Sequence, residues 1–348
     1  MGPLALLLGL LLVSFLVTSI LIVPFINTLY FLKFQRAQQN TRDAFGMLTP
    51  IFDSFHKIKA GTPVGGGLLV IVVVSVLFAF LIPLLYFAGV EITSVHQNAQ
   101  SEINILFFTF ISFGLLGLYD DVKKFFGFEK EKFFGLKMKY KLVLQIILGA
   151  IIASLMYTDL GISFLHVPII NYTLHMGWLY IPFATFVIVA FANAVNITDG
   201  LDGLAAGTLM ICLFGLWILS GSILDIPLSI FIALWLGSLI SFLYFNVFPA
   251  RMFMGDVGAL AFGATLAVVG LLLGKVAGLL IVGFIFVVEV SSSLAQLLSK
   301  KYRKKKLFPA APIHLTLQKN GWEEPKIVQR AWLVQVMLTI FGVWLSLI

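Results

Sequence analysis

Cysteine, charge and histidine are all scarce in this 348-residue sequence. The one cysteine, Cys212, excludes a disulfide within the chain, and we expect it to pack in the apolar run that contains it. Only 11% of the residues are charged and 60% are hydrophobic, whereas a soluble domain is about half apolar. The composition therefore excludes an ordinary soluble protein and predicts one that is embedded in a membrane.

Several chemical signatures are also missing. The five histidines lack the spacing of metal ligands, which argues against zinc, and we expect His96, His166 and His175 at the surface. No G-x-x-x-x-G-K-[ST] loop is present, so an ATP-driven P-loop mechanism is not indicated. Neither a plausible Ser-His-Asp arrangement nor an internal repeat is found.

Hydrophobic runs that are long enough, or nearly so, to cross a bilayer recur along the whole chain. We place them at residues 4–32, 66–90, 104–119, 141–157, 178–195, 203–221, 226–247, 257–273, 276–298 and 330–348. The first is too long for a signal peptide, so we expect a retained helix. We predict one all-α polytopic membrane domain, residues 1–348, with about ten transmembrane helices and a surface segment or short hairpin at 162–170.

The basic residues are distributed very unevenly over the predicted loops. All but one of the 23 Lys and Arg fall in loops 33–65, 120–141, 247–256 and 299–330; the exception is Lys275. By the positive-inside rule, these loops and residues 196–202 face the cytoplasm, and both termini face outward. The basic loops are also expected to attract anionic lipid of the bilayer, or to concentrate a polyanionic substrate.

Three polar motifs lie at predicted helix ends on that cytoplasmic side. Asp120, Asp121 and Lys124 end the third helix, and Asp120 shares a helix face with Lys124 because they are four residues apart. Asp256 stands at the mouth of the eighth helix, between two glycines that allow close backbone approach. Taken alone, each motif has a simpler interpretation, as interfacial charge for the aspartate pair and as a helix N-cap for Asp256.

The third motif, Asn196, Asp199 and Asp202, steps by three residues, which on a helix places the side chains within an arc of about 120°. The simpler interpretations are a turn, or the start of the sixth helix with Thr198 or Asp199 as its N-cap. Carboxylates with few histidines suit Mg²⁺, which binds one or two carboxylates together with substrate phosphates. Acidic groups, Mg²⁺ and lysines at a membrane face point to phosphoryl transfer that involves a lipid.

These residues stand in motifs that resemble, in order and over nearly the whole chain, those of the polyprenyl-phosphate N-acetylhexosamine-1-phosphate transferases. The matching stretches are residues 59–67 (KAGTPVGGG), 120–124 (DDVKK), 193–203 (NAVNITDGLDG), 253–256 (FMGD), 311–314 (APIH) and 321–332 (GWEEPKIVQRAW). The last stretch is similar to the branch that transfers phospho-N-acetylmuramoyl-pentapeptide. Two departures are His314-Leu-Thr where the family has three histidines, and Val64-Gly65 where it has Thr-Met.

The resemblance implies a reaction in the bacterial cytoplasmic (inner) membrane that serves peptidoglycan synthesis. Undecaprenyl phosphate attacks the β-phosphorus of UDP-MurNAc-pentapeptide, giving lipid I and UMP. The resemblance also implies Mg²⁺ as cofactor, a homodimer, and no nucleic acid as partner. It implies that Asp256 ligates Mg²⁺, that Asp120 positions the lipid phosphate and accepts its proton, that Asp121 supports this network, and that Lys124 binds phosphate.

The resemblance further implies a set of residues that bind the nucleotide-sugar substrate. These are Asn196, Asp199 and Asp202, then Phe253 stacked on uracil with Lys59 and Gln296 beside it, and His314 at a phosphate. The alternative for Gln296 is a hydrogen bond between helices, and for His314 a surface position at a helix end. The competing functions are a UDP-GlcNAc transferase of the same superfamily and a transporter of an anionic substrate, although transporters place their site near the bilayer midplane, often in repeated halves.

Overall fold

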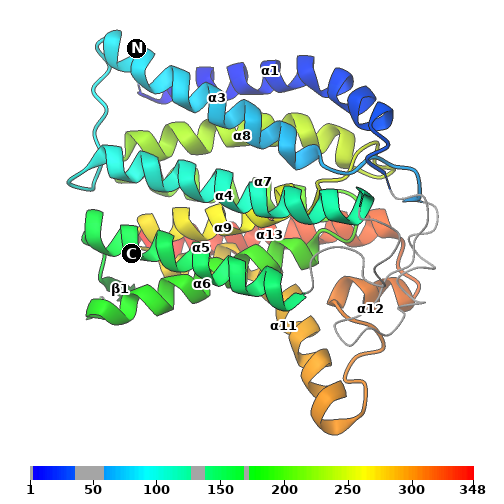
Figure 1. Ribbon diagram of the computed structural model, residues 1–348. Helices are drawn as coiled ribbons and strands as arrows, with labels where there is room; N and C mark the ends of the chain where they lie inside the picture. Colours follow the sequence, from blue (N-terminus) through cyan, green and yellow to red (C-terminus); the bar gives the residue numbers. More distant parts are fainter. Residues whose placement is uncertain (1–2, 36–58, 127–137, 168–171) are drawn as a thin grey trace.

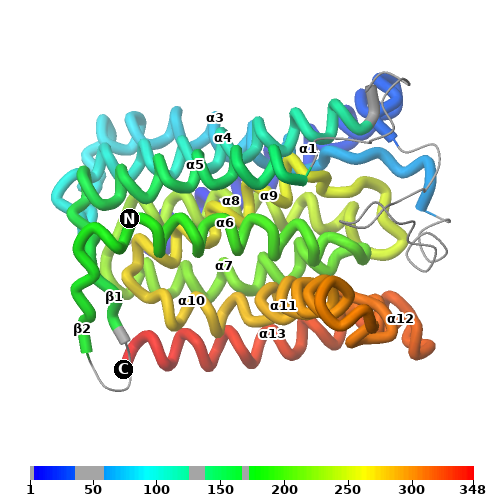
Figure 2. The backbone as a smooth tube through the Cα atoms, turned by 60° about the horizontal axis from the view of Figure 1, so that its bottom comes forward, coloured from blue at the N-terminus to red at the C-terminus, as the bar shows by residue number. Residues whose placement is uncertain are grey.

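The computed structural model describes residues 3–35, 59–126, 138–167 and 172–348 as one bundle of roughly parallel helices (Figures 1 and 2). Within these residues, nine helices are long and apolar enough to cross a membrane. They are α1 (Pro3–Phe31), α3 (Gly66–Phe87), α4 (Ala99–Phe126), α5 (Met138–Asp159), α6 (Tyr180–Thr198), α7 (Leu204–Ser222), α8 (Ile226–Asn246), α9 (Gly255–Leu272) and α13 (Glu324–Leu347). The prediction of a mostly helical polytopic membrane protein is therefore confirmed, and both termini lie at the same end of the bundle.

The predicted span 276–298 is not a straight helix. It consists of α10 (Val276–Val282) and α11 (Phe284–Leu298), which meet at a bend of 77° and count as a tenth span only if taken together. The buried face of α11 carries Glu289, Ser292 and Gln296, so this helix is better suited to polar protein contacts than to lipid. It projects out of the bundle, and α12 (Ile313–Lys319) lies beside it, toward the end opposite the termini (Figure 1).

The end of the bundle that holds the termini also carries the only strands among the described residues. Strands β1 (Phe164–Val167) and β2 (Tyr172–His175) pair antiparallel, and a short 3-10 helix, η2 (Gly177–Leu179), leads on to α6. The hairpin alternative for residues 162–170 is thus confirmed, with its second strand later than predicted. At the other end, the π-helical turn η3 (Ser299–Arg303) follows α11.

Helices α8 and α9 form the centre of the bundle, whereas α1, α5 and α13 turn most of their apolar surface outward, as expected for helices in contact with lipid. Phe110 of α4 packs against Phe231 and Trp235 of α8 and against Phe262 of α9, with ring centroids 5.3, 5.4 and 5.7 Å apart. This aromatic contact fixes α4 against the two central helices. The ends of α4 and α9 beyond it bring the polar motifs together.

Gly117 sets the distance between α4 and α9 just before the Asp120-Asp121 motif. A Cβ atom at this position would lie 2.2 Å from the backbone oxygen of Asp256. Only glycine allows the two backbones to approach so closely. The position of Asp256 relative to the aspartate pair of α4 therefore depends on this residue.

The substitution Gly117→Ala is expected to separate α4 from α9 and to destabilise the protein by about 2 kcal/mol, within the range for overpacked cores. Thermal unfolding of the purified protein in detergent would measure the change. Gly114→Ala is the matched control, because its Cβ would meet only the mobile tip of Ile71, at 2.9 Å. Equal melting temperatures for the two variants would contradict the close packing described here.

Candidate active site

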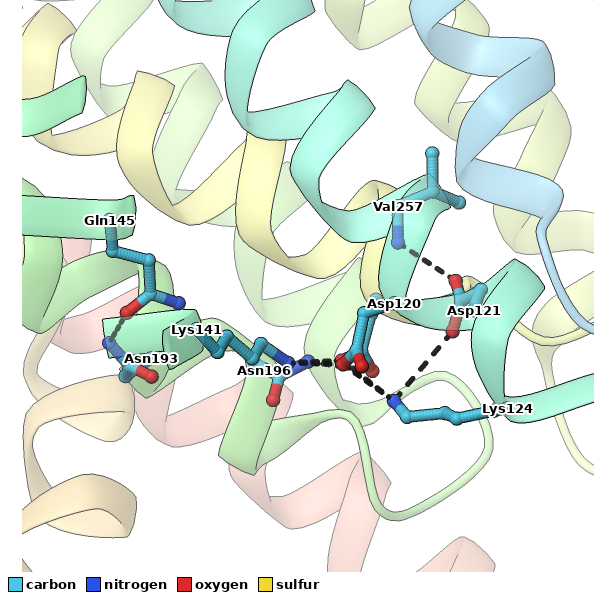
Figure 3. A network of polar contacts seen from close by, with 9 residues as sticks. Asp120, Asp121, Lys124, Lys141, Gln145, Asn193, Asn196 and Val257 are labelled. Atoms are coloured by element: carbon cyan, nitrogen blue, oxygen red, sulfur yellow. Dashed lines mark hydrogen bonds and ion pairs between the residues drawn. The ribbon is translucent and has the colours of Figure 1, made fainter. Parts of the chain in front are cut away.

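The site lies at the end of the bundle opposite the termini (Figure 1), where helices contribute the polar side chains drawn in Figure 3. The end of α4 supplies Asp120, Asp121 and Lys124, and α5 supplies Lys141 near its start. The first turn of α9 contributes Asp256. We call these five residues the carboxylate–lysine cluster.

Two ammonium groups lie among the three carboxylates of the cluster. Lys124 Nζ is 3.1 Å from Asp120 and 2.8 Å from Asp256, and Lys141 Nζ is 3.0 Å from the same oxygen of Asp120 and also pairs with Asp256. Asp120 is buried, and the other three side chains are partly buried. Removal of these charges from water is costly unless they are paired, so the positive and negative groups depend on each other.

Asp121 has a different role from its neighbour Asp120. Its side chain is buried and accepts a hydrogen bond from the backbone N–H of Val257, at 3.0 Å (Figure 3). It also lies 3.8 Å from Lys124. Asp121 therefore joins the end of α4 to the first turn of α9, and so holds the backbone next to Asp256 in position.

Helix α6 adds two amide side chains at the edge of the cluster. Asn196 donates a hydrogen bond to Asp256 Oδ1 at 3.1 Å, and Asn193 donates to Gln145 Oε1 of α5 at 2.7 Å (Figure 3). The first contact places the motif 193–203 directly beside the motif 253–256. The second connects α6 to the helix that carries Lys141.

A second charged group, which we call the Lys59 group, consists of Lys59, Asp202 and Glu324. Lys59 Nζ lies 2.7 Å from Asp202 and 2.5 Å from Glu324, and it stands over the ring of Phe253 at 6.0 Å from the centroid. Asp202 also accepts a hydrogen bond from Ala250 N–H at 2.9 Å. Four separate sequence motifs thus meet at one lysine.

Backbone contacts between residues 59–67 and 253–258 explain the glycines in both motifs. Gly65 and Gly66 donate their N–H groups to the carbonyl of Phe253, at 3.1 and 2.8 Å. A Cβ atom on Gly67 would lie 2.2 Å from the Cα of Gly258. The start of α3 therefore packs directly on the start of α9, and this contact holds Lys59 and Phe253 together.

The turn between α6 and α7 differs from the N-cap alternative for Thr198 or Asp199. Thr198 ends α6, Asp199 caps its C-terminus, and the residue that precedes α7 is Gly203, with φ of 79°. Asn196, Asp199 and Asp202 consequently do not share one helix. Burial, followed by the negative charge of Asp256, raises the pKa of Asp199 to about 7.

The predicted substrate-binding residue Gln296 has its polar atoms engaged within the protein. Gln296 accepts from the N–H groups of Leu307 and Phe308, at 2.8 and 2.9 Å, and donates to the Phe308 carbonyl at 3.0 Å. Gln296 therefore holds the loop after η3. Within the part of the chain that the structure describes, no hydrogen bond or ion pair joins Gln296 to Lys59. The predicted place of Gln296 beside uracil stays a prediction.

His314 is buried, which excludes the alternative of a surface position. Its Nδ1 lies 2.9 Å from Glu289 of α11, while Nε2 is buried and, among the described residues, has no hydrogen-bond partner. A Cβ atom on Gly200 would lie 2.6 Å from this nitrogen. His314 thus packs against the backbone between Asp199 and Asp202.

Lys141 and Glu324 are the two residues that sequence reasoning missed. Lys141 was grouped with the basic residues of a loop, although it lies in α5 and reaches two of the three carboxylates. Glu324 was part of a motif without a role of its own. A signal for Glu324 was present, because an acidic residue in the first turn of a helix next to a predicted lysine site is a natural ion-pair partner.

The donor set of the cluster suits Mg²⁺ and is poor for zinc. Asp120, Asp121, Asp256 and the amide of Asn196 offer oxygen ligands. Hard oxygen donors are what Mg²⁺ prefers, and it binds few carboxylates because it keeps room for substrate oxygens. The two lysines show that the carboxylates already accommodate positive charge at this place.

Known proteins similar to this chain give the same picture. Residues 103–274 match the model of glycosyl transferase family 4. The phospho-N-acetylmuramoyl-pentapeptide-transferase of Clostridium perfringens is 37% identical over 316 residues, which cover 91% of each chain. This chain belongs to that transferase family. The enzymes of the same name from Staphylococcus epidermidis and Rickettsia canadensis are 34% and 37% identical over 339 residues each, covering 96% and 92% of this chain and 97% and 88% of theirs.

Family membership covers both polar groups of the site. The match to the Staphylococcus epidermidis enzyme covers 96% of this chain and therefore includes Lys59 and Glu324. All five residues of the carboxylate–lysine cluster lie inside residues 103–274, which the family model matches. The resemblance derived from short motifs is therefore confirmed. The fold also brings these motifs together in space.

Proposed function

We propose that this chain transfers phospho-MurNAc-pentapeptide from UDP-MurNAc-pentapeptide to undecaprenyl phosphate, producing lipid I and UMP for peptidoglycan synthesis. Membership in the transferase family supports this activity. The observation that carries the proposal is the position of the two groups. The carboxylate–lysine cluster offers a site for phosphates, and the adjoining Lys59 group with Phe253 offers a site for a nucleotide.

The site faces the cytoplasm of a bacterial inner membrane in this proposal. Described basic residues such as Lys59, Arg251 and Lys304 belong to the loops at the end of the bundle that carries the site, whereas Lys275 lies between α9 and α10 at the other end. The positive-inside rule then directs the site inward and both termini outward. UDP-linked substrates are cytoplasmic, which agrees with this orientation. The homodimer stays a prediction.

The proposed reaction replaces one phosphoanhydride bond by another. An oxygen of the lipid phosphate forms a bond to the β-phosphorus of the UDP-sugar, and the bond from that phosphorus to the bridging oxygen breaks, so UMP leaves with the electron pair. A phosphate monoester has its second pKa near 6 and is already largely dianionic at pH 7. The larger barrier is therefore the repulsion between two anions rather than a lack of nucleophile.

Residues of the cluster reduce that repulsion and orient the lipid phosphate. Lys124 and Lys141 lie within hydrogen-bonding distance of the carboxylates and are placed to contact phosphoryl oxygens. Asp120 is the candidate for holding the lipid phosphate and accepting its remaining proton. Asp121 acts through the backbone of Val257, as a positioning residue.

Asp256 would hold the Mg²⁺ ion, with the amide of Asn196 beside it. When bound, the ion would offset negative charge on the transferred phosphoryl group and on its neighbours. The nucleotide is proposed to occupy the side of Lys59, with Phe253 stacked on uracil and Asp199 and Asp202 near the sugar. His314, whose Nε2 faces Gly200, is proposed to lie close to a phosphate of the same substrate.

Release of UMP by the purified protein tests the proposed substrate. The protein would be supplied with undecaprenyl phosphate, Mg²⁺, and either UDP-MurNAc-pentapeptide or UDP-GlcNAc. We expect UMP and a lipid-linked product only from the pentapeptide substrate. A lipid product formed from UDP-GlcNAc alone would replace this proposal by the GlcNAc-1-phosphate activity.

The substitution Glu324→Gln is expected to raise KM for the UDP-linked substrate about 10-fold with a smaller effect on kcat, because it weakens one charge-assisted bond, worth about 1.5–3 kcal/mol, that positions Lys59. Steady-state kinetics would measure both constants. Glu323→Gln is the matched control, since Glu323 is exposed and makes no side-chain capping bond. Equal KM values for the two variants would contradict the positioning role.

A further inference from the structure

Three polar side chains meet at the end of the bundle that holds the termini. His96 lies in the connection between α3 and α4, Glu102 in the first turn of α4, and Asp225 at the N-cap of α8. Glu102 and Asp225 are fully buried, and His96 is partly buried. The expected surface position of His96 therefore holds only in part, because residues distant in sequence cover some of its side chain.

One ligand atom from each of these side chains points into a shared space. A ring nitrogen of His96, a carboxylate oxygen of Glu102 and one of Asp225 lie within 4.8 Å of one another. His96 Nε2, Glu102 Oε1 and Asp225 Oδ2 are buried, and apart from the contact between the two carboxyl groups they have no hydrogen-bond partner among the described residues. Buried polar atoms are nearly always paired, so three atoms at one place without other partners require an explanation.

The remaining oxygens of the two carboxylates are held by the protein. The hydroxyl of Ser94 donates to Glu102 Oε2 at 2.6 Å, and the N–H of Leu228 donates to Asp225 Oδ1 at 3.2 Å. Each carboxylate thus has one oxygen held by a donor of the protein and a second, buried oxygen without such a donor among the described residues. Supporting hydrogen bonds of this kind are typical around metal ligands.

The charges of the site also call for a cation. Two carboxylates are buried next to each other, and within the described part of the chain no Lys or Arg forms an ion pair with either of them. An unpaired buried charge costs several kcal/mol, and two adjacent ones repel each other in addition. A divalent ion among the three ligand atoms would neutralise both carboxylates.

We propose that His96, Glu102 and Asp225 bind a divalent transition-metal ion, for which Zn²⁺ is the best-suited probe. One imidazole and two carboxylates are a ligand set for such an ion, and three protein ligands leave a position for water. This site is separate from the carboxylate–lysine cluster. Glu102 and Asp120 are 18 residues apart on α4, which corresponds to about 27 Å along the helix.

The ion would fasten the connection after α3 to the turn before α8. These two segments already touch, because Ile226 donates its N–H to the carbonyl of Thr93 at 3.0 Å, and the Thr93 hydroxyl donates to the carbonyl of Leu224 at 3.4 Å. A metal that bridges the same segments binds only the folded state and therefore raises its stability. The role of the site is structural, and it takes no part in the proposed transfer reaction.

Zinc analysis of the full-length protein tests this proposal. The detergent-purified chain would be treated with chelator, equilibrated with Zn²⁺ in the presence of excess Mg²⁺, freed of unbound metal, and analysed for zinc per chain. We expect about one zinc ion in the wild type and in the control His175→Gln, whose histidine is exposed on β2, and none above background in His96→Gln. Zinc should also raise the melting temperature of the wild type but not of His96→Gln.

Two results would overturn the proposal. One is a wild-type chain without stoichiometric zinc, and the other is equal zinc content in wild type and His96→Gln. If His96→Gln cannot be purified, Glu102→Gln and the visible spectrum of the Co²⁺-loaded wild type replace it. The proposal then requires loss of bound metal in Glu102→Gln and cobalt absorption bands of a nitrogen- and oxygen-ligated ion, and it fails without them. The variant Asp256→Ala should keep its zinc, since that residue lies at the other end of the bundle.

Discussion

Replacing Asp256 by alanine is expected to lower the rate of UMP release by about 10³-fold or more, the upper range for the loss of one electrostatic catalytic group. Asp256 is the point where the cluster converges, since it pairs with Lys124 and Lys141 and accepts a hydrogen bond from Asn196. Its loss removes the carboxylate proposed to hold Mg²⁺ and leaves two ammonium groups short of negative charge. Turnover measured at saturating substrates would show the effect.

The control for this variant is Asp159→Asn, which removes an exposed carboxylate at the far end of α5. It should retain wild-type turnover. Asp256→Ala should elute as a folded protein in size-exclusion chromatography, because its backbone position is fixed by the packing of Gly117 and by the bond from Val257 to Asp121. Turnover of Asp256→Ala within a few-fold of wild type would refute the role given to this residue.

Asp120→Asn is expected to lower kcat by about 10²–10³-fold, while the KM for the UDP-linked substrate changes little. The reason is that the amide keeps the shape of Asp120 but can neither accept the proton of the lipid phosphate nor neutralise Lys124 and Lys141. Steady-state kinetics with each substrate varied in turn would separate the two constants.

Asp121→Asn provides the comparison for this prediction, because Asp121 is equally buried and adjacent in sequence but bonds to a backbone N–H. An asparagine oxygen still accepts that bond, so a smaller loss of turnover is expected. If Asp121→Asn were the more damaging of the two, the assignment of Asp120 to the lipid phosphate would have to be exchanged with that of Asp121.

The membrane fold was largely predictable because the lipid environment requires long apolar helices, which are visible in sequence as unbroken hydrophobic runs. The bend at Gly283 was harder to predict. Hydrophobicity is similar on both sides of it, while the direction of α11 depends on tertiary contacts of Glu289 with His314 and of Gln296 with the loop at Phe308. Such contacts join segments that the sequence does not place next to each other.

The site was predictable where its residues stand in compact motifs. Asp120 and Lys124 do share a helix face, and Asp256 stands at the start of α9, as the spacing indicated. Lys141 was hidden among other lysines, since its position on α5 shows only when α4, α5 and α9 are packed together. His96 and Asp225 are more than a hundred residues apart, so no spacing rule could connect them.

The most direct test of the account is UMP release from UDP-MurNAc-pentapeptide in the complete mixture, compared with mixtures that lack undecaprenyl phosphate or Mg²⁺. The lipid phosphate and Mg²⁺ are proposed to meet the phosphates of the UDP-linked substrate at the carboxylate–lysine cluster. We therefore expect UMP only when all three are present, with lipid I formed in equal amount. UMP release without undecaprenyl phosphate, or at an unchanged rate without Mg²⁺, would contradict it.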